Sequence, residues 1–155
     1  MQTSNSSPRI IVTDGDFDLG AEAARLEAGP ETGAVVTFTG RVRDVAVGLR
    51  HMEIEHYPGM TERALTDIAR EAAERWPLSG VTIIHRHGRL EPGSRIMMVG
   101  TASRHRDAAF EAAKFLMDYL KSRAPFWKKE VTAAGADWVA AEDADEAALA
   151  GWSRD

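Results

Sequence analysis

The segment Val81–Ala102, VTIIHRHGRLEPGSRIMMVGTA, holds two runs of β-branched and apolar residues around a turn signal. Val81–His87 and Arg95–Ala102 have the length and composition of strands, and Glu91–Gly93 (EPG) between them is typical of a turn. Strands joined by so short a connection pair antiparallel, because a parallel pair needs a longer crossover. The predicted hairpin therefore favours antiparallel sheet at the centre of the fold.

A helix is predicted on each side of this hairpin. Before it, Thr61–Trp76 has Thr61 as a candidate N-cap and Pro77 as its stop. After it, Ser103 is a candidate N-cap for a helix that ends before Pro125, because the residue preceding a proline avoids helical geometry. Helical spacing predicts the buried faces to be Leu65, Ile68, Ala69, Ala72 and Trp76 in the first helix, and Ala109, Ala113, Leu116, Met117 and Leu120 in the second.

Shorter elements are predicted on either side of this centre. They are a strand at Arg9–Thr13, a short helix at Phe17–Ala28, strands at Gly33–Arg43 and Leu49–Tyr57, and two late strands at Phe126–Thr132 and Trp138–Ala141. The mixed order of helices and hairpin-like strand pairs predicts the α+β class. We expect a sandwich with mainly antiparallel sheet and two main helices.

The chain has the size of one domain. Its 155 residues are 44% hydrophobic and 28% charged, a composition typical of globular proteins. We expect a single catalytic domain over residues 9–141. A disordered polar tail is expected over residues 1–8, and an acidic, alanine-rich tail that forms a frayed helix over residues 142–155.

Several functional classes are excluded by what the sequence lacks. The absence of cysteine excludes disulfides, thiolate metal ligands and a thiol nucleophile. No apolar run approaches the ~20 residues that span a bilayer. The N-terminal residues resemble no export signal, so a cytoplasmic protein is expected.

The charge is unevenly distributed along the chain. Between Arg104 and Lys129 there are seven Lys and Arg residues and three Asp and Glu residues, a surplus of four positive charges. Because the net charge is −5, the rest of the chain carries nine negative charges. Such a basic segment indicates a local anion site, or else the solvated face of a helix.

The segment Leu120–Glu130, LKSRAPFWKKE, is the strongest candidate for chemistry. Lys121 lies near the end of a predicted helix and Lys128 follows the turn at Pro125, so the two lysines can converge beside aromatic side chains. A lysine that is desolvated and near another cation loses its proton more readily. The pair could therefore bind an anion and transfer protons or attack a carbonyl, although Lys121 could instead only complement the helix dipole.

Two arginine groups and one histidine pair are weaker candidates. Arg104, His105 and Arg106 lie at a predicted helix N-terminus, which favours phosphate, and Arg41 and Arg43 lie at the end of a strand. The histidine pair is His85 and His87, which share one face of a strand because side chains two positions apart point the same way. No third metal ligand is placed beside them, so a structural role is favoured and no metal site is predicted.

These residues lie in segments that resemble a known family. The segments GAVVTFTGRVRD, IEHYPGM, ERWPL, IHRHG, SRHRDAAFEA and MDYLKSRAPFWKKE are similar to the large, catalytic subunit of molybdopterin synthase, from about Gly33 to Trp138. The resemblance implies an α/β-hammerhead fold and a sulfur-transfer enzyme of molybdenum cofactor biosynthesis. Such enzymes convert cyclic pyranopterin monophosphate into molybdopterin, and no cofactor of their own is implied.

The resemblance also implies partners and site residues. Sulfur would arrive as a thiocarboxylate on the C-terminal glycine of a small ubiquitin-like subunit, and the large subunit would form a dimer with one small subunit at each end. The catalytic residues would be Lys121 and Lys128. The substrate-binding residues would be Arg43, His105 and Arg106, with Arg41, Lys129 and Glu130 in the same motifs.

Two further hypotheses follow from the sequence. His105 and Lys121 are sixteen positions apart, roughly 24 Å along one helix, so a site that uses both would be shared between two copies of the chain. The alternative to an enzyme is a non-catalytic module that binds a phosphorylated ligand or the C-terminal tail of a partner. An RNA-binding surface is disfavoured by the negative net charge.

Overall fold

Two four-stranded sheets organise the chain in the computed structural model, which describes residues 7–139 and 143–153. The first sheet has the order β1-β4-β6-β2, with β1 at Arg9–Thr13, β4 at Leu78–Arg86, β6 at Arg95–Ser103 and β2 at Ala34–Arg41. The second has the order β5-β3-β7-β8, with β5 at Gly88–Leu90, β3 at Leu49–His56, β7 at Phe126–Thr132 and β8 at Gly135–Trp138. The described pairs are antiparallel except β1 with β4, which is parallel.

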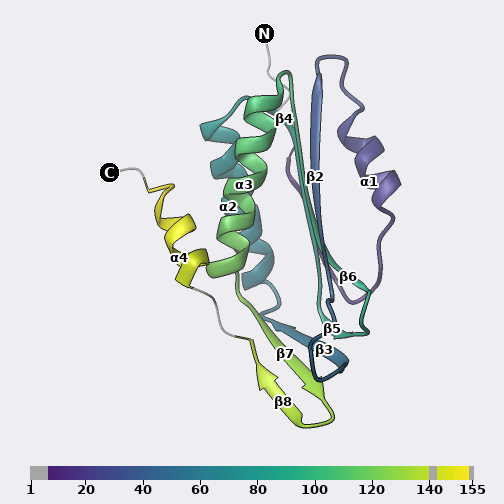
Figure 1. Ribbon diagram of the computed structural model, residues 1–155. Coiled ribbons are helices and arrows are strands. Elements are labelled where there is room, and N and C mark those ends of the chain that lie inside the picture. Colours follow the sequence, from purple (N-terminus) through teal and green to yellow (C-terminus); the bar gives the residue numbers. More distant parts are fainter. Residues whose placement is uncertain (1–6, 140–142, 154–155) are drawn as a thin grey trace.

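The helices are arranged around the first sheet. They are α1 at Leu19–Leu26, α2 at Met60–Arg75, α3 at Arg106–Ser122 and α4 at Asp143–Ala150. Figure 1 shows α2 and α3 on one face of this sheet and α1 on the other, while α4 packs against α3. None of the described helices is both long and apolar enough to cross a membrane. The predicted α+β class with two main helices is confirmed.

The predicted central hairpin is present as the β4–β6 pair. Thr82 pairs with Gly100 and Ile84 with Met98 in an antiparallel register. Its connection also contains β5, which pairs with β3 in the second sheet. The segment that joins the hairpin strands therefore also joins the two sheets.

Both predicted hydroxyl caps are wrong. The N-cap of α2 is Gly59, whose N–H donates to Glu62 Oε1 at 2.9 Å, while Thr61 Oγ1 accepts from the Tyr57 N–H and donates to the Pro125 carbonyl. Ser103 is the last residue of β6, and the helix after it begins at Arg106 with no side-chain cap. Both hydroxyls instead donate to carbonyl groups distant in the sequence, those of Pro125 and Pro77. Spacing along the sequence cannot predict such tertiary contacts.

The buried faces of the two main helices follow the predicted spacing. The predicted residues of α2 and α3 are buried or partly buried, and all of them except Ala109 belong with residues of β4 and β6 to one core cluster. The prediction missed Ala112 and Phe115, which are also buried. The predicted strand at Leu49–Tyr57 is present as β3, in which Met52 and Ile54 are buried while Glu53 and Glu55 are not.

The ends of the chain differ in part from the prediction. The last strand is Gly135–Trp138 rather than Trp138–Ala141, and residues 140–142 lie outside the described residues. Residues 1–6 of the predicted N-terminal tail also lie outside them. In the acidic C-terminal segment, Trp152 packs edge-on against Trp76 and Phe115, and its Nε1 donates to Asp118 Oδ2 at 2.7 Å. This contact attaches the C-terminal segment to α3.

Candidate active site

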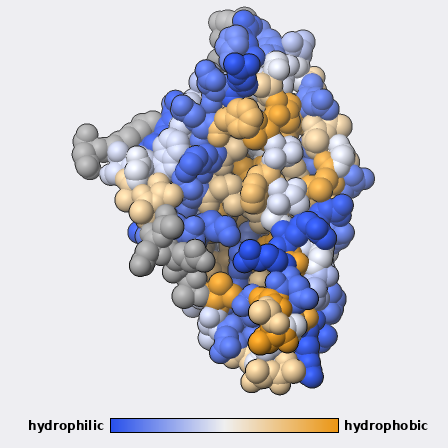
Figure 2. All heavy atoms as spheres, viewed as in Figure 1, coloured by the Kyte–Doolittle hydropathy of each residue, from blue (hydrophilic) through white to orange (hydrophobic). Residues whose placement is uncertain are grey.

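A cleft of about 840 Å³ lies where the two sheets meet. Its walls come from the end of β2, from single residues of β3, β4 and β6, from the C-terminal end of α3 and from the beginning of β7. Figure 2 shows a band of hydrophilic residues across the molecule at this level, between more apolar surface above and below. This volume is within the range of small-molecule sites.

The two candidate lysines both line this cleft. Lys121 is in the last turn of α3, Pro125 turns the chain, and Lys128 is the third residue of β7. Phe126 and Glu130 line the cleft together with Lys128, whereas Lys129 does not. Side chains alternate along a strand, which places Phe126, Lys128 and Glu130 of this short segment on one wall, and Trp127 also lines the cleft.

The proton affinity of Lys128 is reduced by its surroundings. Burial, and then the positive charge of Lys121, lower the pKa of Lys128 to about 8, while the carboxylate of Asp145 on α4 acts in the opposite direction. With this pKa, roughly a tenth of the side chain is the uncharged amine at pH 7. Lys128 can therefore exchange a proton near neutral pH.

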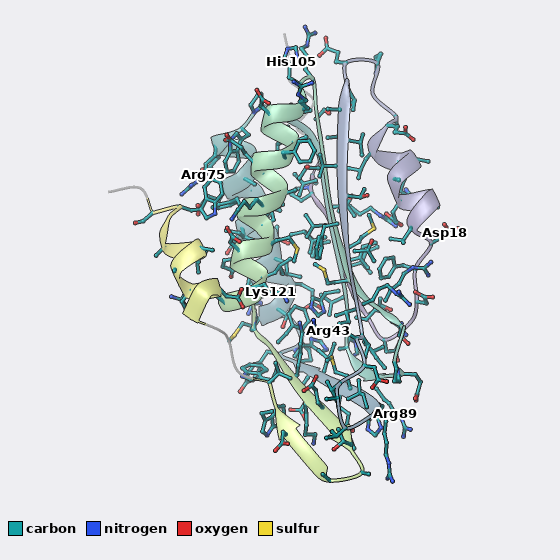
Figure 3. All side chains as sticks on the ribbon, in the orientation of Figure 1. Asp18, Arg43, Arg75, Arg89, His105 and Lys121 are labelled. Atoms are coloured by element: carbon teal, nitrogen blue, oxygen red, sulfur yellow. The ribbon has the colours of Figure 1, made fainter. Side chains whose placement is uncertain are left out.

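Arg41 is the last residue of β2, Arg43 lies two positions beyond it, and both line the cleft. A β-bulge between Gly40 and Arg41 precedes Val42, which is buried and donates its N–H to the Ser94 carbonyl at 2.8 Å. The Arg41 guanidinium donates to the Gly93 carbonyl, at 3.2 Å from Nε and 3.0 Å from Nη2. Figure 3 shows Arg43 and Lys121 in the same region, where the two sheets meet.

His105 and Arg106 are not in this cleft. His105 is the exposed N-cap of α3 and Arg106 is its first residue, whereas Lys121 is at the opposite end of the same helix. Figure 3 shows His105 and Lys121 separated by the length of α3. A single copy of the chain therefore does not bring these predicted site residues together.

Lys129 and Glu130 have different surroundings. Lys129 Nζ lies 3.3 Å from Glu53 Oε2 and 5.2 Å from the centre of the Trp138 ring, on the other face of β7. Glu130 pairs with Met52 across the β3–β7 ladder and lines the cleft. Of these two predicted residues, Glu130 is the one placed at the cleft.

Among the cleft residues that sequence reasoning missed, Asp145 and His85 adjoin the two lysines most directly in their effect on charge. Asp145 comes from α4, which is distant in the sequence, and no motif marks it. His85 was noted only as half of a histidine pair, but β4 ends at Arg86 and the ring of His87 contacts His56 instead, with ring centres 4.2 Å apart. The sequence signal for His85 was a polar residue inside an otherwise apolar strand.

Metal chelation is expected to leave the activity of the protein unchanged. Within the described residues, no group of three His, Asp or Glu side chains is placed to hold a metal ion, and the sequence has no cysteine. Prolonged dialysis against a chelator, followed by an activity assay, measures this. A loss of activity that added zinc restores would contradict the prediction.

Comparison with known proteins gives consistent matches. The MoaE protein family matches residues 12–123. The molybdopterin synthase catalytic subunit of Cereibacter sphaeroides is 63% identical over 145 residues, which cover 93% of this chain and 99% of that protein.

Two solved structures are similar over nearly the whole chain. The MoaE protein of Burkholderia ambifaria superimposes with a TM-score of 0.81 at 52% identity, covering 94% of this chain and 97% of that one. A molybdopterin synthase structure from Staphylococcus aureus gives a TM-score of 0.77 at 29% identity, covering 90% and 98%.

Proposed function

This chain belongs to the MoaE protein family, and from that membership together with the cleft we infer that it is the catalytic subunit of a molybdopterin synthase. The enzyme acts in molybdenum cofactor biosynthesis, where it transfers sulfur to cyclic pyranopterin monophosphate and forms molybdopterin. The observation that carries this inference is the meeting of Lys121 and Lys128 in one cleft with Arg41 and Arg43.

The cleft has the polarity that a phosphorylated pterin requires. Its cations come from three places that converge at the junction of the sheets: Arg41 and Arg43 at and just after the end of β2, Lys121 and Arg123 at the end of α3, and Lys128 in β7. Charged donors of this kind bind phosphate oxygens strongly. Ser122 Oγ is buried at the cleft without a hydrogen-bond partner among the described residues, so it is available to a ligand.

The two lysines have different roles in this proposal. Lys128, whose pKa is lowered to about 8 by burial and by Lys121, acts as the uncharged amine that accepts a proton or attacks a carbonyl. Lys121 is exposed at the mouth of the cleft and holds an anion with its ammonium group. Separate roles for two neighbouring lysines agree with their different burial.

The sulfur must be supplied by a partner. The chain has no cysteine, so it cannot carry a persulfide of its own. We propose that a small ubiquitin-like subunit delivers sulfur as a C-terminal thiocarboxylate, whose extended tail enters the cleft beside Lys128. The relatives are described as the catalytic subunit of the synthase, which agrees with an enzyme of more than one subunit.

Formation of the dithiolene product tests the function. The protein is mixed with cyclic pyranopterin monophosphate and the thiocarboxylated small subunit, and the products are analysed by mass spectrometry. We expect molybdopterin to form in this mixture. The matched control uses the same small subunit ending in an ordinary carboxylate, with which no sulfur is transferred.

The same experiment distinguishes the enzyme from a binding module. If the pterin phosphate or the partner tail binds tightly but no dithiolene appears with the thiocarboxylated subunit, the chain is a non-catalytic module and the proposed function is wrong.

A further inference from the structure

His85 is a buried polar residue at the cleft that the proposed mechanism does not yet use. Only 3% of its surface is exposed, yet it lines the cleft near the end of β4. Buried polar atoms in folded proteins are nearly always hydrogen-bonded, so each ring nitrogen of such a residue has a role to be assigned.

One of these nitrogens is fixed by the backbone. Nδ1 lies 2.8 Å from the carbonyl oxygen of Arg86, and because a carbonyl only accepts, Nδ1 carries the hydrogen. Burial, and then the charge of Lys128, lower the pKa of His85 to about 3, so the ring is neutral at physiological pH. The second nitrogen, Nε2, is therefore an acceptor, and no described residue donates a hydrogen bond to it.

The ring also contacts the strand that carries Lys128. The imidazole stacks on the ring of Phe126, with centres 3.6 Å apart and planes at 14°. Phe126 opens β7 two positions before Lys128, and both side chains line the cleft. Because His85 belongs to the first sheet and Phe126 to the second, this stack fixes where β7 begins relative to the first sheet.

The other ionisable groups around this pair are mostly cationic. Lys121 from α3 lowers the pKa of Lys128, and Asp145 from α4 raises it. His56 from β3 and His87 lower the pKa of His85. The remaining charged residues of the cleft are Arg41, Arg43, Arg123 and Glu130. A neutral acceptor here can receive a hydrogen bond from an ammonium group without adding another positive charge.

We propose that His85 is a positioning residue for Lys128: its ring holds Phe126 at the start of β7, and its Nε2 offers an uncharged hydrogen-bond acceptor to the Lys128 side chain. The inference rests on the proposed function only where it concerns the rate of product formation. Its statement about the protonation of Lys128 holds for the chain by itself.

Two substitutions separate the two contributions. His85→Phe keeps an aromatic ring against Phe126 but removes the hydrogen-bond acceptor. Because that acceptor stabilises the ammonium form of Lys128, its loss should lower the pKa of Lys128. His85→Gln keeps an acceptor but removes the ring. Lys128 is titrated in the full-length chain by NMR of carbon-13-labelled lysine side chains, with its signal assigned from Lys128→Arg. Product formation is measured over the same pH range.

We expect different results from the two variants. In His85→Phe the midpoint of the Lys128 titration falls by about 1 pH unit, the scale of one hydrogen bond to a charged group, and the rising limb of the pH–rate profile shifts with it. In His85→Gln the midpoint stays nearer to that of the unchanged chain, but product formation falls on the order of tenfold because Lys128 is less well positioned.

His87 provides the matched control for His85. His87→Phe makes the same chemical change two positions away, at a residue that contacts His56 and does not line the cleft, and should leave both readouts unchanged.

The inference is overturned if the midpoint in His85→Phe equals that of the unchanged chain, or if His85→Gln forms product at the full rate. If His85→Phe does not fold, the His85→Gln arm decides alone. If the midpoint shifts as expected but no chain makes product, the proposed function fails and the assignment of His85 stands.

Discussion

Replacing Lys128 by alanine is expected to lower product formation by at least ~100-fold, the scale of a lost proton-transfer or nucleophilic group. The side chain lies in the cleft wall between Phe126 and Glu130, and its pKa is lowered to about 8 by burial and by Lys121. Folding should survive, because Lys128 makes no ion pair with any described residue and removing a buried ammonium group relieves its desolvation. Lys121→Ala is expected to cause a loss of the same order, since it removes the charge that both holds the anion and lowers the pKa of Lys128.

The pH dependence gives a second measure of the same residue. If Lys128 acts as the uncharged amine, the rate increases as the pH is raised through about 8. At lower pH the rate is reduced, because most Lys128 side chains are then in the inactive ammonium form. In Lys121→Ala the repulsion by Lys121 is gone, so the rising limb of the residual activity shifts to higher pH.

A surface lysine provides the matched control. Lys114 is on the same helix as Lys121, is exposed, and forms an ion pair with Asp118 at 2.9 Å away from the cleft. Lys114→Ala should change the rate less than twofold, since exposed ion pairs contribute little. Steady-state rates of dithiolene formation, with circular dichroism for folding, measure all three variants. Near-normal turnover in Lys128→Ala would show that this lysine is not catalytic.

Mixing two inactive variants is expected to restore activity if the site is shared between two copies of the chain. Arg106 is the first residue of α3 and Lys121 is in its last turn, so one pterin phosphate cannot contact both within a single copy. A two-fold dimer can place the Arg106 end of one copy at the Lys121 end of the other. In a mixed dimer of Arg106→Ala and Lys121→Ala, one of the two sites then has both residues and the other has neither.

The expected recovery can be calculated. Random exchange makes half of the dimers mixed, and one site in each of these is intact, so about a quarter of the unmodified activity returns. Each variant incubated alone under the same exchange conditions is the control and stays inactive. Subunit exchange is followed by mass spectrometry of differently labelled chains. Verified exchange with no recovery would mean that the site lies within one copy.

The parts of the fold that follow from local pattern could be predicted. The strand at β3, the helical spacing in α2 and α3, and the turn between β4 and β6 depend on neighbours in the sequence, and the structure confirms them. Thr61 and Ser103 have the residue type of a helix cap, but each hydroxyl donates to a distant carbonyl, of Pro125 and Pro77 respectively. Tertiary contacts of this kind cannot be found by spacing.

The candidate site also has a part that could be predicted from the sequence and a part that could not. Lys121 and Lys128 could be placed together because one proline turn joins their two elements. The contact of His85 with Phe126 could not be predicted, since it joins residues of different sheets. Neither could the approach of Asp145, which depends on how α4 packs against α3.

The alternation of the chain between the two sheets has a consequence for the order of folding. From β2 to β7, each successive strand belongs to the other sheet, so neither sheet can be completed from a continuous piece of sequence. Arg9 must find Thr82, and Ala34 must find Ser103, before the first sheet exists. Such non-local pairing lowers folding rates, because long loops must close before native contacts compensate for their entropy. During synthesis, the cleft can therefore assemble only after β7 has left the ribosome, because β7 carries Lys128 and is made after every strand of the first sheet.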